Sequence, residues 1–407
     1  MKGLSLFLMM TFAAPTMANI GHKPHLDLEM NSDEYRHILR NTKSGFETAP
    51  DPAVETALKI GERLSKWIAL VNATRSNETA IRLTSQATRR GIPIDKPNTY
   101  SPSIIEKETA TLMSELPSTI KEIITSTDEL PSDIPIDDET FIIHARKLDR
   151  NYQSAARYKS LIQWRSEYIE AAKDDVRGYY YLTSNKITNV ELIDIRTIPL
   201  DKIAPLKVAL SQICLNSNEA NCRHKVDKAF ENNKVAELYS KYFPNSKKIW
   251  DAFFVIPLTG RRNDVNWSGT MMTVPFNTPK IEKFIAYLQD NIEDEFRFTD
   301  WGLKISFGNF TLGPRLVFQP GVVPHVNGLG GNEIVMDSNQ PIEEYESQWT
   351  IRHEFGHVIG LPDCYHEFYD VSQQAFVNYQ LDITDLMCSR AGNMNERIYN
   401  ELKRVYQ

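Results

Sequence analysis

The apolar positions in the first half of the chain recur with a helical period. Asp51-Pro52 pairs an N-cap residue with a residue suited to the first turn of a helix, and the apolar residues that follow are mostly three or four positions apart. These residues are Val54, Ala57, Leu58, Leu64, Ile68 and Val71. Similar patterns cover residues 104–116 and 138–176. We therefore expect residues 19–245 to form a mainly α-helical region.

From about residue 248 the pattern changes to short apolar runs that alternate with helical stretches. Such runs, bounded by Gly or Pro, are typical of strands. In this part of the chain, strands are expected at residues 250–258, 303–307, 315–318 and 333–336, and helices at 281–292, across His353 and at 395–406. One further strand is expected earlier, at residues 178–182 of the helical region. The stretch between Gly360 and this last helix has an irregular pattern. The predicted fold class is α+β, with residues 246–407 forming a domain separate from the helical region.

The N-terminus carries the features of a secretory signal. Lys2 provides a positive charge, residues 4–12 form a short apolar core, and residues 16–18 resemble a cleavage site. We therefore interpret residues 1–18 as a signal peptide and expect a secreted or periplasmic protein. No later apolar run approaches the length of a spanning helix, so no membrane span is predicted.

The composition agrees with a globular product. The chain has 407 residues, of which 41% are hydrophobic and 24% charged, and its net charge is −7. Chains of this length usually contain more than one domain, and we expect two or three. Because the chain is mildly acidic and has no block of basic residues, we do not expect a nucleic-acid partner.

The four cysteines fall into two local pairs, Cys214 with Cys222 and Cys364 with Cys388. In an oxidising compartment such pairs favour two disulfides, and four buried thiols are the alternative. A free Cys364 thiolate is also a candidate metal ligand. We expect the helical region to be either a removable propeptide or a permanent binding domain. If it is a propeptide, Cys214 or Cys222 is a candidate for blocking the active site.

The stretch from His353 to Asp363 carries the candidate chemistry. His353 and His357 are four residues apart, so on a helix their side chains lie on one face and can bind one metal ion. Glu354 is placed to take a proton from water that the metal activates. Gly360 comes where a left-handed residue often ends a helix. The chain can then turn back and bring Asp363 to the metal as a third ligand.

This set of ligands is typical of a catalytic zinc site, in which the fourth position is left for water or substrate. His366 and Glu367 are close enough in the sequence to compete with Asp363 for the third position. A structural zinc site is disfavoured, because such sites usually fill all four positions with Cys and His. The sequence therefore predicts Zn²⁺ as the cofactor.

The motif H-E-x-x-H-x-x-G-x-x-D, followed by Leu386-Met387, resembles the metzincin zinc peptidases and, among them, the snapalysin-type endopeptidases. The resemblance implies a mixed sheet beside the zinc helix, Asp363 as the third ligand and Met387 as an apolar floor below the metal. Other metzincins carry a tyrosine soon after this methionine. None follows Met387 closely here, and Tyr365 is the nearest candidate for stabilising an oxyanion.

The sequence therefore predicts a secreted zinc endopeptidase that acts on protein or peptide substrates. In this interpretation His353, His357 and Asp363 hold the metal, and Glu354 is the general base. The alternative function is an exported binding or adhesin-like protein with a degenerate peptidase domain. The intact Glu354 argues against this alternative.

Overall fold

The structure is a computed structural model that describes residues 26–40, 51–85, 88 and 90–407. The predicted signal peptide, residues 1–18, lies outside the described residues. The chain combines helices with mixed sheets, so the predicted α+β class is confirmed at this level. None of the helices in the described ranges has the length and apolar content needed to cross a bilayer.

The described residues up to Asp174 are mainly helical, as predicted. Its elements are α1 (Ser32–Arg40), α2 (Pro52–Asn72), the short strand β1 (Asn98–Tyr100), α3 (Pro102–Glu115), α4 (Ser118–Thr125), α5 (Asp138–Ile162), α6 (Arg165–Ala171) and a 3-10 turn (Ala172–Asp174). The side chain of Asp51 accepts a hydrogen bond from the Ala53 N–H at 2.8 Å and so caps α2. Helices α2 to α5 share a core in which the rings of Trp67 and Phe141 lie 5.1 Å apart.

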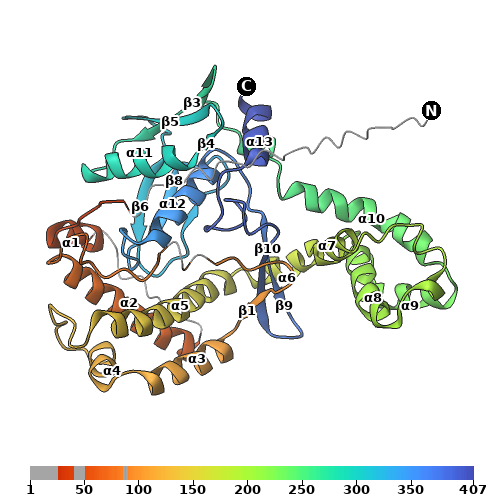
Figure 1. Cartoon of the computed structure of the whole chain (residues 1–407), viewed down its shortest axis with the longest axis horizontal. Coiled ribbons are helices and arrows are strands. Elements are labelled where there is room, and N and C mark those ends of the chain that lie inside the picture. The colour runs from red at the N-terminus through yellow and green to blue at the C-terminus, as the bar shows by residue number, and fades with distance from the viewer. Residues whose placement is uncertain (1–25, 41–50, 86–87, 89) are drawn as a thin grey trace, which may run out of the picture.

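A helical lobe extends from one side of the molecule (Figure 1). It consists of α7 (Arg177–Ser184), a 3-10 turn (Ile195–Thr197), α8 (Leu200–Leu215), α9 (Cys222–Glu231) and α10 (Val235–Ala252). The strand predicted at 178–182 is therefore wrong. A Cβ on Gly178 would lie 2.6 Å from the carbonyl oxygen of Ala209, so this glycine lets α7 approach α8 closely. The predicted disulfide between Cys214 and Cys222 is present and joins α8 to α9.

The strand predicted at 250–258 is also wrong. Helix α10 continues to Ala252, and a 3-10 turn covers Leu258–Gly260. The ring of Trp250 lies 5.3 Å from that of Tyr179, so within the lobe its apolar surface packs against α7 instead of entering a sheet. The domain boundary predicted near residue 245 falls inside α10. The division into domains stays a prediction.

Two mixed sheets frame the helix that carries the histidines, with strand orders β2-β3-β5-β4 and β6-β8-β7. Their strands are β2 (Asn266–Ser268), β3 (Met271–Asn277), β4 (Arg297–Phe298), β5 (Trp301–Gly308), β6 (Arg315–Gln319), β7 (His325–Val326) and β8 (Glu333–Asp337). The helices beside them are α11 (Lys283–Glu295), α12 (Tyr345–Val358) and α13 (Glu396–Tyr406). The strands predicted at 303–307, 315–318 and 333–336 are confirmed within β5, β6 and β8. The helices predicted at 281–292 and 395–406 correspond to α11 and α13.

The stretch after Gly360 is more regular than predicted, because it contains the antiparallel strands β9 (Tyr365–Asp370) and β10 (Ala375–Gln380). Strand β10 also pairs with β1, which comes from the helical region, so that Thr99 lies opposite Val377. Consecutive residues of β9 and β10 are buried. The hairpin therefore lacks the polar–apolar alternation that marks a half-exposed strand. In Figure 1 the hairpin lies beside the long helix α5.

Candidate metal centre

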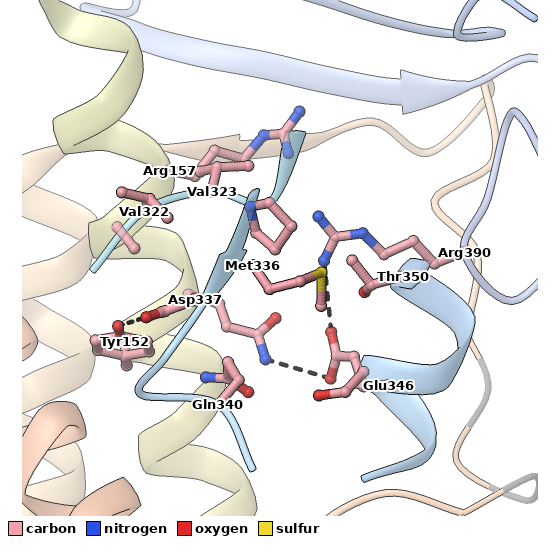
Figure 2. Close-up of a pocket in the computed structure, with 14 residues that line it drawn as sticks. Tyr152, Arg157, Val322, Val323, Met336, Asp337, Gln340, Glu346, Thr350 and Arg390 are labelled. Carbon is pink, nitrogen blue, oxygen red and sulfur yellow. Dashed lines mark hydrogen bonds and ion pairs between the residues drawn. The ribbon is translucent and has the colours of Figure 1, made fainter. Parts of the chain in front are cut away.

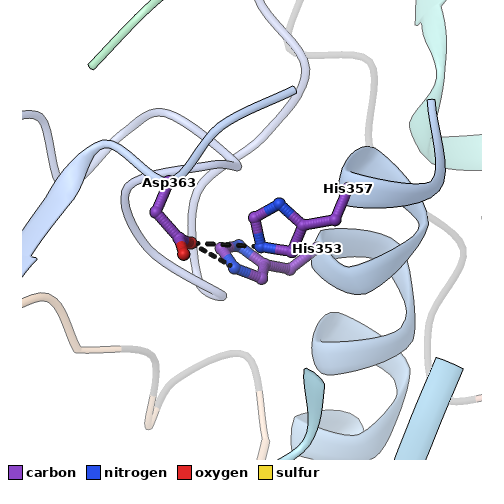
Figure 3. Close-up of side chains that lie close together, drawn as sticks. All are labelled: His353, His357 and Asp363. Carbon is purple, nitrogen blue, oxygen red and sulfur yellow. Dashed lines mark hydrogen bonds and ion pairs between the residues drawn. The ribbon is translucent and has the colours of Figure 1, made fainter. Parts of the chain in front are cut away.

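The two histidines project from one face of α12, and Asp363 faces them from the loop that follows the helix (Figure 3). The Nε2 atoms of His353 and His357 lie 3.0 and 3.2 Å from the same oxygen, Oδ1 of Asp363. The two imidazole rings are nearly perpendicular, with centroids 4.8 Å apart. The structure thus brings together the three side chains that the sequence singled out as ligands.

Both imidazoles are held by hydrogen bonds at the opposite nitrogen. Nδ1 of His353 lies 2.8 Å from the carbonyl oxygen of Leu386, and Nδ1 of His357 lies 2.8 Å from that of Leu361. A carbonyl oxygen only accepts, so each Nδ1–H donates. When the imidazoles are neutral, the remaining nitrogen, Nε2, therefore carries a lone pair that can bind a metal ion, whereas a protonated Nε2 donates to Asp363. Three lone-pair-bearing atoms that converge on one point suit a bound cation.

The charges of these side chains depend on one another. Burial by itself lowers the pKa of His357, but the adjacent Asp363 carboxylate raises this pKa to about 9. Burial by itself raises the pKa of Asp363, yet the two histidines hold it well below the usual range. Asp363 is therefore ionised at neutral pH. Two imidazole nitrogens and a carboxylate oxygen within 4.8 Å of one another suit a divalent transition metal.

The turn after α12 places Asp363. Gly360 has φ +88°, and a Cβ at this position would lie 2.4 Å from the carbonyl oxygen of Gly260. Both the left-handed backbone and the close approach therefore require glycine. The N–H of Leu361 donates to the carbonyl oxygen of Gly356 at 3.0 Å and closes the helix end. The chain then reverses, which carries Asp363 to the two histidines.

Met387 lies directly under α12. A Cβ on Gly356 would be 2.3 Å from the Met387 Sδ atom, so the glycine between the two histidines leaves room for the methionine. The Cys364 N–H donates to the Met387 carbonyl oxygen at 3.0 Å, and Cys364 forms the predicted disulfide with Cys388. Because both sulfurs are in the disulfide, Cys364 as a thiolate ligand is wrong, and so are four free thiols.

Glu354 is buried beside the histidines. Its Oε2 atom makes no hydrogen bond to any residue that the structure describes. Glu354 nevertheless lines a cavity of about 530 Å³ together with His353 and Tyr365. A buried carboxylate oxygen without a protein partner, at the wall of a cavity, is placed to act on water or on a bound substrate.

Tyr365 begins β9, and its ring stacks on that of His353 with centroids 6.2 Å apart. Burial, reinforced by the negative charge of Asp363, raises the pKa of Tyr365, so its hydroxyl remains a hydrogen-bond donor. The two competing candidates for third ligand have other surroundings. His366 packs against Phe253, Phe368 and Tyr379. Glu367 binds Arg157 and Tyr100.

The wall opposite α12 comes from the helical region, which the sequence did not connect to the site. Helix α5 contributes Arg146, Arg150, Gln153 and Arg157 to the cavity that contains Glu354. A smaller cavity of about 90 Å³ adjoins it and shares Gln153 and Arg157 with it. Figure 2 shows this smaller cavity between α5 and α12, with apolar side chains such as Val322 and Met336 on one side.

The spacing of these α5 residues was the available signal. Arg146, Arg150, Gln153 and Arg157 follow one another at intervals of four, three and four, which places them on one helix face.

In comparisons with known proteins, no family model matches the chain, and neither a curated protein nor a solved structure does so.

Proposed function

We propose that the protein is a secreted, zinc-dependent endopeptidase of the metzincin type. The proposal rests on the convergence of the His353 and His357 Nε2 atoms on Asp363. Beside them lies Glu354, whose Oε2 atom has no hydrogen-bond partner among the described residues. Two imidazoles and a carboxylate, with a further carboxylate as base, form a ligand set typical of zinc hydrolases. A purely structural site has no use for such a base.

Each residue has a distinct part in the reaction. When bound, zinc would polarise the scissile carbonyl group and lower the pKa of a water molecule. Glu354 accepts the proton of the attacking water at Oε2 and then releases it to the nitrogen of the leaving amine. The Tyr365 hydroxyl donates a hydrogen bond to the carbonyl oxygen as negative charge develops there. His353 and His357 keep their orientation because each Nδ1–H is bound to a carbonyl oxygen.

We further infer that the helical region remains in the active enzyme as a permanent wall. Arg157 of α5 forms two hydrogen bonds of 2.6 Å with the buried carboxylate of Glu367, and Tyr100 of β1 stacks on Phe376 at 5.5 Å. Loss of this region would leave Glu367 without its cation, a change that typically costs about 3–5 kcal/mol. N-terminal sequencing of the exported protein should give a start near residue 19. A mature chain starting near residue 246 would contradict the inference.

The variant Glu354→Gln tests the assigned base. Because it removes the base but no ligand, it should retain zinc and lose peptidase activity on casein. We expect a loss of at least about 100-fold in turnover, in line with the contribution of general base catalysis. Glu231→Gln, on the exposed face of α9, is the control. More than a tenth of wild-type turnover in Glu354→Gln would show that another group is the base.

A further inference from the structure

The larger cavity beside the candidate metal centre is rich in arginine. Among the described residues that line it are five arginines and three carboxylates, which come from separate parts of the chain. The arginines are Arg90, Arg146, Arg150, Arg157 and Arg390, and the carboxylates are Asp149, Glu346 and Glu354. A concave wall with this excess of guanidinium groups attracts anions, whereas the whole chain has a net charge of −7.

Arg157 does not contribute to this excess, because its guanidinium is matched by Glu367 at 2.6 Å. The other arginines of α5 have only main-chain partners among the described residues. Nε of Arg146 donates to the carbonyl oxygen of Leu83, and Nε of Arg150 donates to that of Arg146 at 3.3 Å. Both side chains line the cavity, and neither has an ion-pair partner in the described part of the chain.

Arg390 approaches from the opposite wall, just after the turn that contains Met387. Its nearest carboxylate, on Glu346, is 3.9 Å away, which leaves this contact weak. Figure 2 shows Arg390 and Glu346 joined by a dashed line at the wall of the smaller cavity. Burial and the neighbouring Glu346 raise the pKa of Asp149, so this carboxylate balances the arginines less than its formal charge suggests.

We propose that the arginines of this cavity bind a carboxylate group of the peptide substrate, either an acidic side chain or the C-terminal carboxylate. Guanidinium groups pair with carboxylates in a planar, two-point geometry, and such pairs are stronger than neutral hydrogen bonds. Arg150 and Arg390 reach the cavity from α5 and from the turn after Met387, so they contact a substrate from two sides. The inference rests on the proposed peptidase function, because the cavity also contains His353 and Glu354.

The test compares matched peptides that differ only in charge. One pair carries Glu or Gln beside the scissile bond, with both C-termini amidated. The second pair has the same neutral side chains with a free or an amidated C-terminus. We expect the wild-type enzyme to cleave the charged member of one pair with a kcat/KM roughly tenfold higher than that of its neutral partner. The pair that shows this preference identifies the source of the carboxylate.

The double variant Arg150→Gln/Arg390→Gln should abolish this preference while it still cleaves the neutral peptides. Arg196→Gln, an exposed arginine of the distant helical lobe, is the matched control and should keep the preference. The preference should also weaken with added salt, since exposed charges are screened. An equal kcat/KM for charged and neutral peptides in the wild type would overturn the proposal.

A binding measurement separates this inference from the proposed function. Zinc-loaded Glu354→Gln protein should bind the preferred charged peptide roughly tenfold more tightly than its neutral partner, as measured by fluorescence anisotropy. The triple variant with Arg150→Gln and Arg390→Gln should bind both equally. If no peptide is hydrolysed by the wild type but the charge preference in binding persists, the peptidase proposal fails and the carboxylate site stands. If both peptides bind equally while hydrolysis is normal, the carboxylate site fails and the peptidase proposal stands.

Discussion

The disulfide between Cys364 and Cys388 should support metal binding as well as stability. Cys364 directly follows the proposed ligand Asp363, and Cys388 follows Met387, whose carbonyl oxygen accepts the N–H of Cys364. The carbonyl oxygen that orients His353 belongs to Leu386, on the same turn. The disulfide therefore holds Asp363 against the turn that orients His353. Replacing both cysteines with alanine should loosen this arrangement.

The expected magnitudes differ for the two effects. The bridge spans a sequence separation of 24 residues, and the chain-entropy model gives roughly 3.5 kcal/mol of unfolding free energy for a loop of this length. Loss of groups that orient metal ligands typically costs about 10–100-fold in metal affinity. The second disulfide provides the control. Cys214 and Cys222 are separated by 8 residues within the helical lobe, and the same model gives roughly 2.6 kcal/mol for that loop.

The assay measures the zinc Kd by competition with a chelating dye, alongside thermal unfolding of the metal-free proteins. The variant Cys364→Ala/Cys388→Ala should lose both stability and zinc affinity. The variant Cys214→Ala/Cys222→Ala should lose stability but keep the wild-type zinc Kd. The same zinc Kd in both variants would refute the argument that the Cys364–Cys388 bridge holds the metal ligands in place.

Three further changes probe the surroundings of the site. Asp363→Ala should weaken zinc binding and Asp363→His should restore it, measured with the same dye; unchanged affinity in the alanine variant would exclude this ligand. Gly356→Ala should lower the unfolding free energy by about 1–2 kcal/mol in thermal unfolding, because overpacking against Met387 outweighs the gain in helix propensity. Burial raises the pKa of Glu344 to about 7. The folded state therefore favours the protonated carboxyl group, and the unfolding free energy that this group contributes is present below about pH 4.5 and lost as the pH rises through 7. Glu344→Gln, which stays neutral, should therefore gain about 1–3 kcal/mol relative to wild type between pH 5 and pH 8, and a constant difference would contradict this pKa.

The sequence was sufficient where local spacing determines the geometry. Two histidines four residues apart share a helix face whatever the rest of the fold is, and Gly360 fits the left-handed turn with φ +88°. The strands β5, β6 and β8 were predictable for a similar reason, since β6 and β8 contain brief apolar runs and β5 alternates apolar with polar residues. These features depend on neighbours in the chain.

The features that were missed depend on contacts between distant segments. Residues 178–182 contain three tyrosines and suggest a strand, but Gly178 allows a helix–helix approach that the sequence does not reveal. The hairpin of β9 and β10 is buried by helices of the N-terminal half, which removes the alternation expected of a strand. The role of α5 in the cavity was missed for the same reason, because its arginines meet Glu354 only through the fold.

The most direct test of the proposed function is the recovery of peptide hydrolysis by metal-depleted protein during titration with Zn²⁺. We predict that hydrolysis is absent after treatment with a chelator and returns in proportion to added zinc until one ion is bound per chain. Asp363→Ala should need a large excess of zinc for the same recovery. Hydrolysis that persists after complete removal of metal, or no hydrolysis of any peptide with one zinc bound per chain, would contradict the assignment of this site as the catalytic centre of a zinc peptidase.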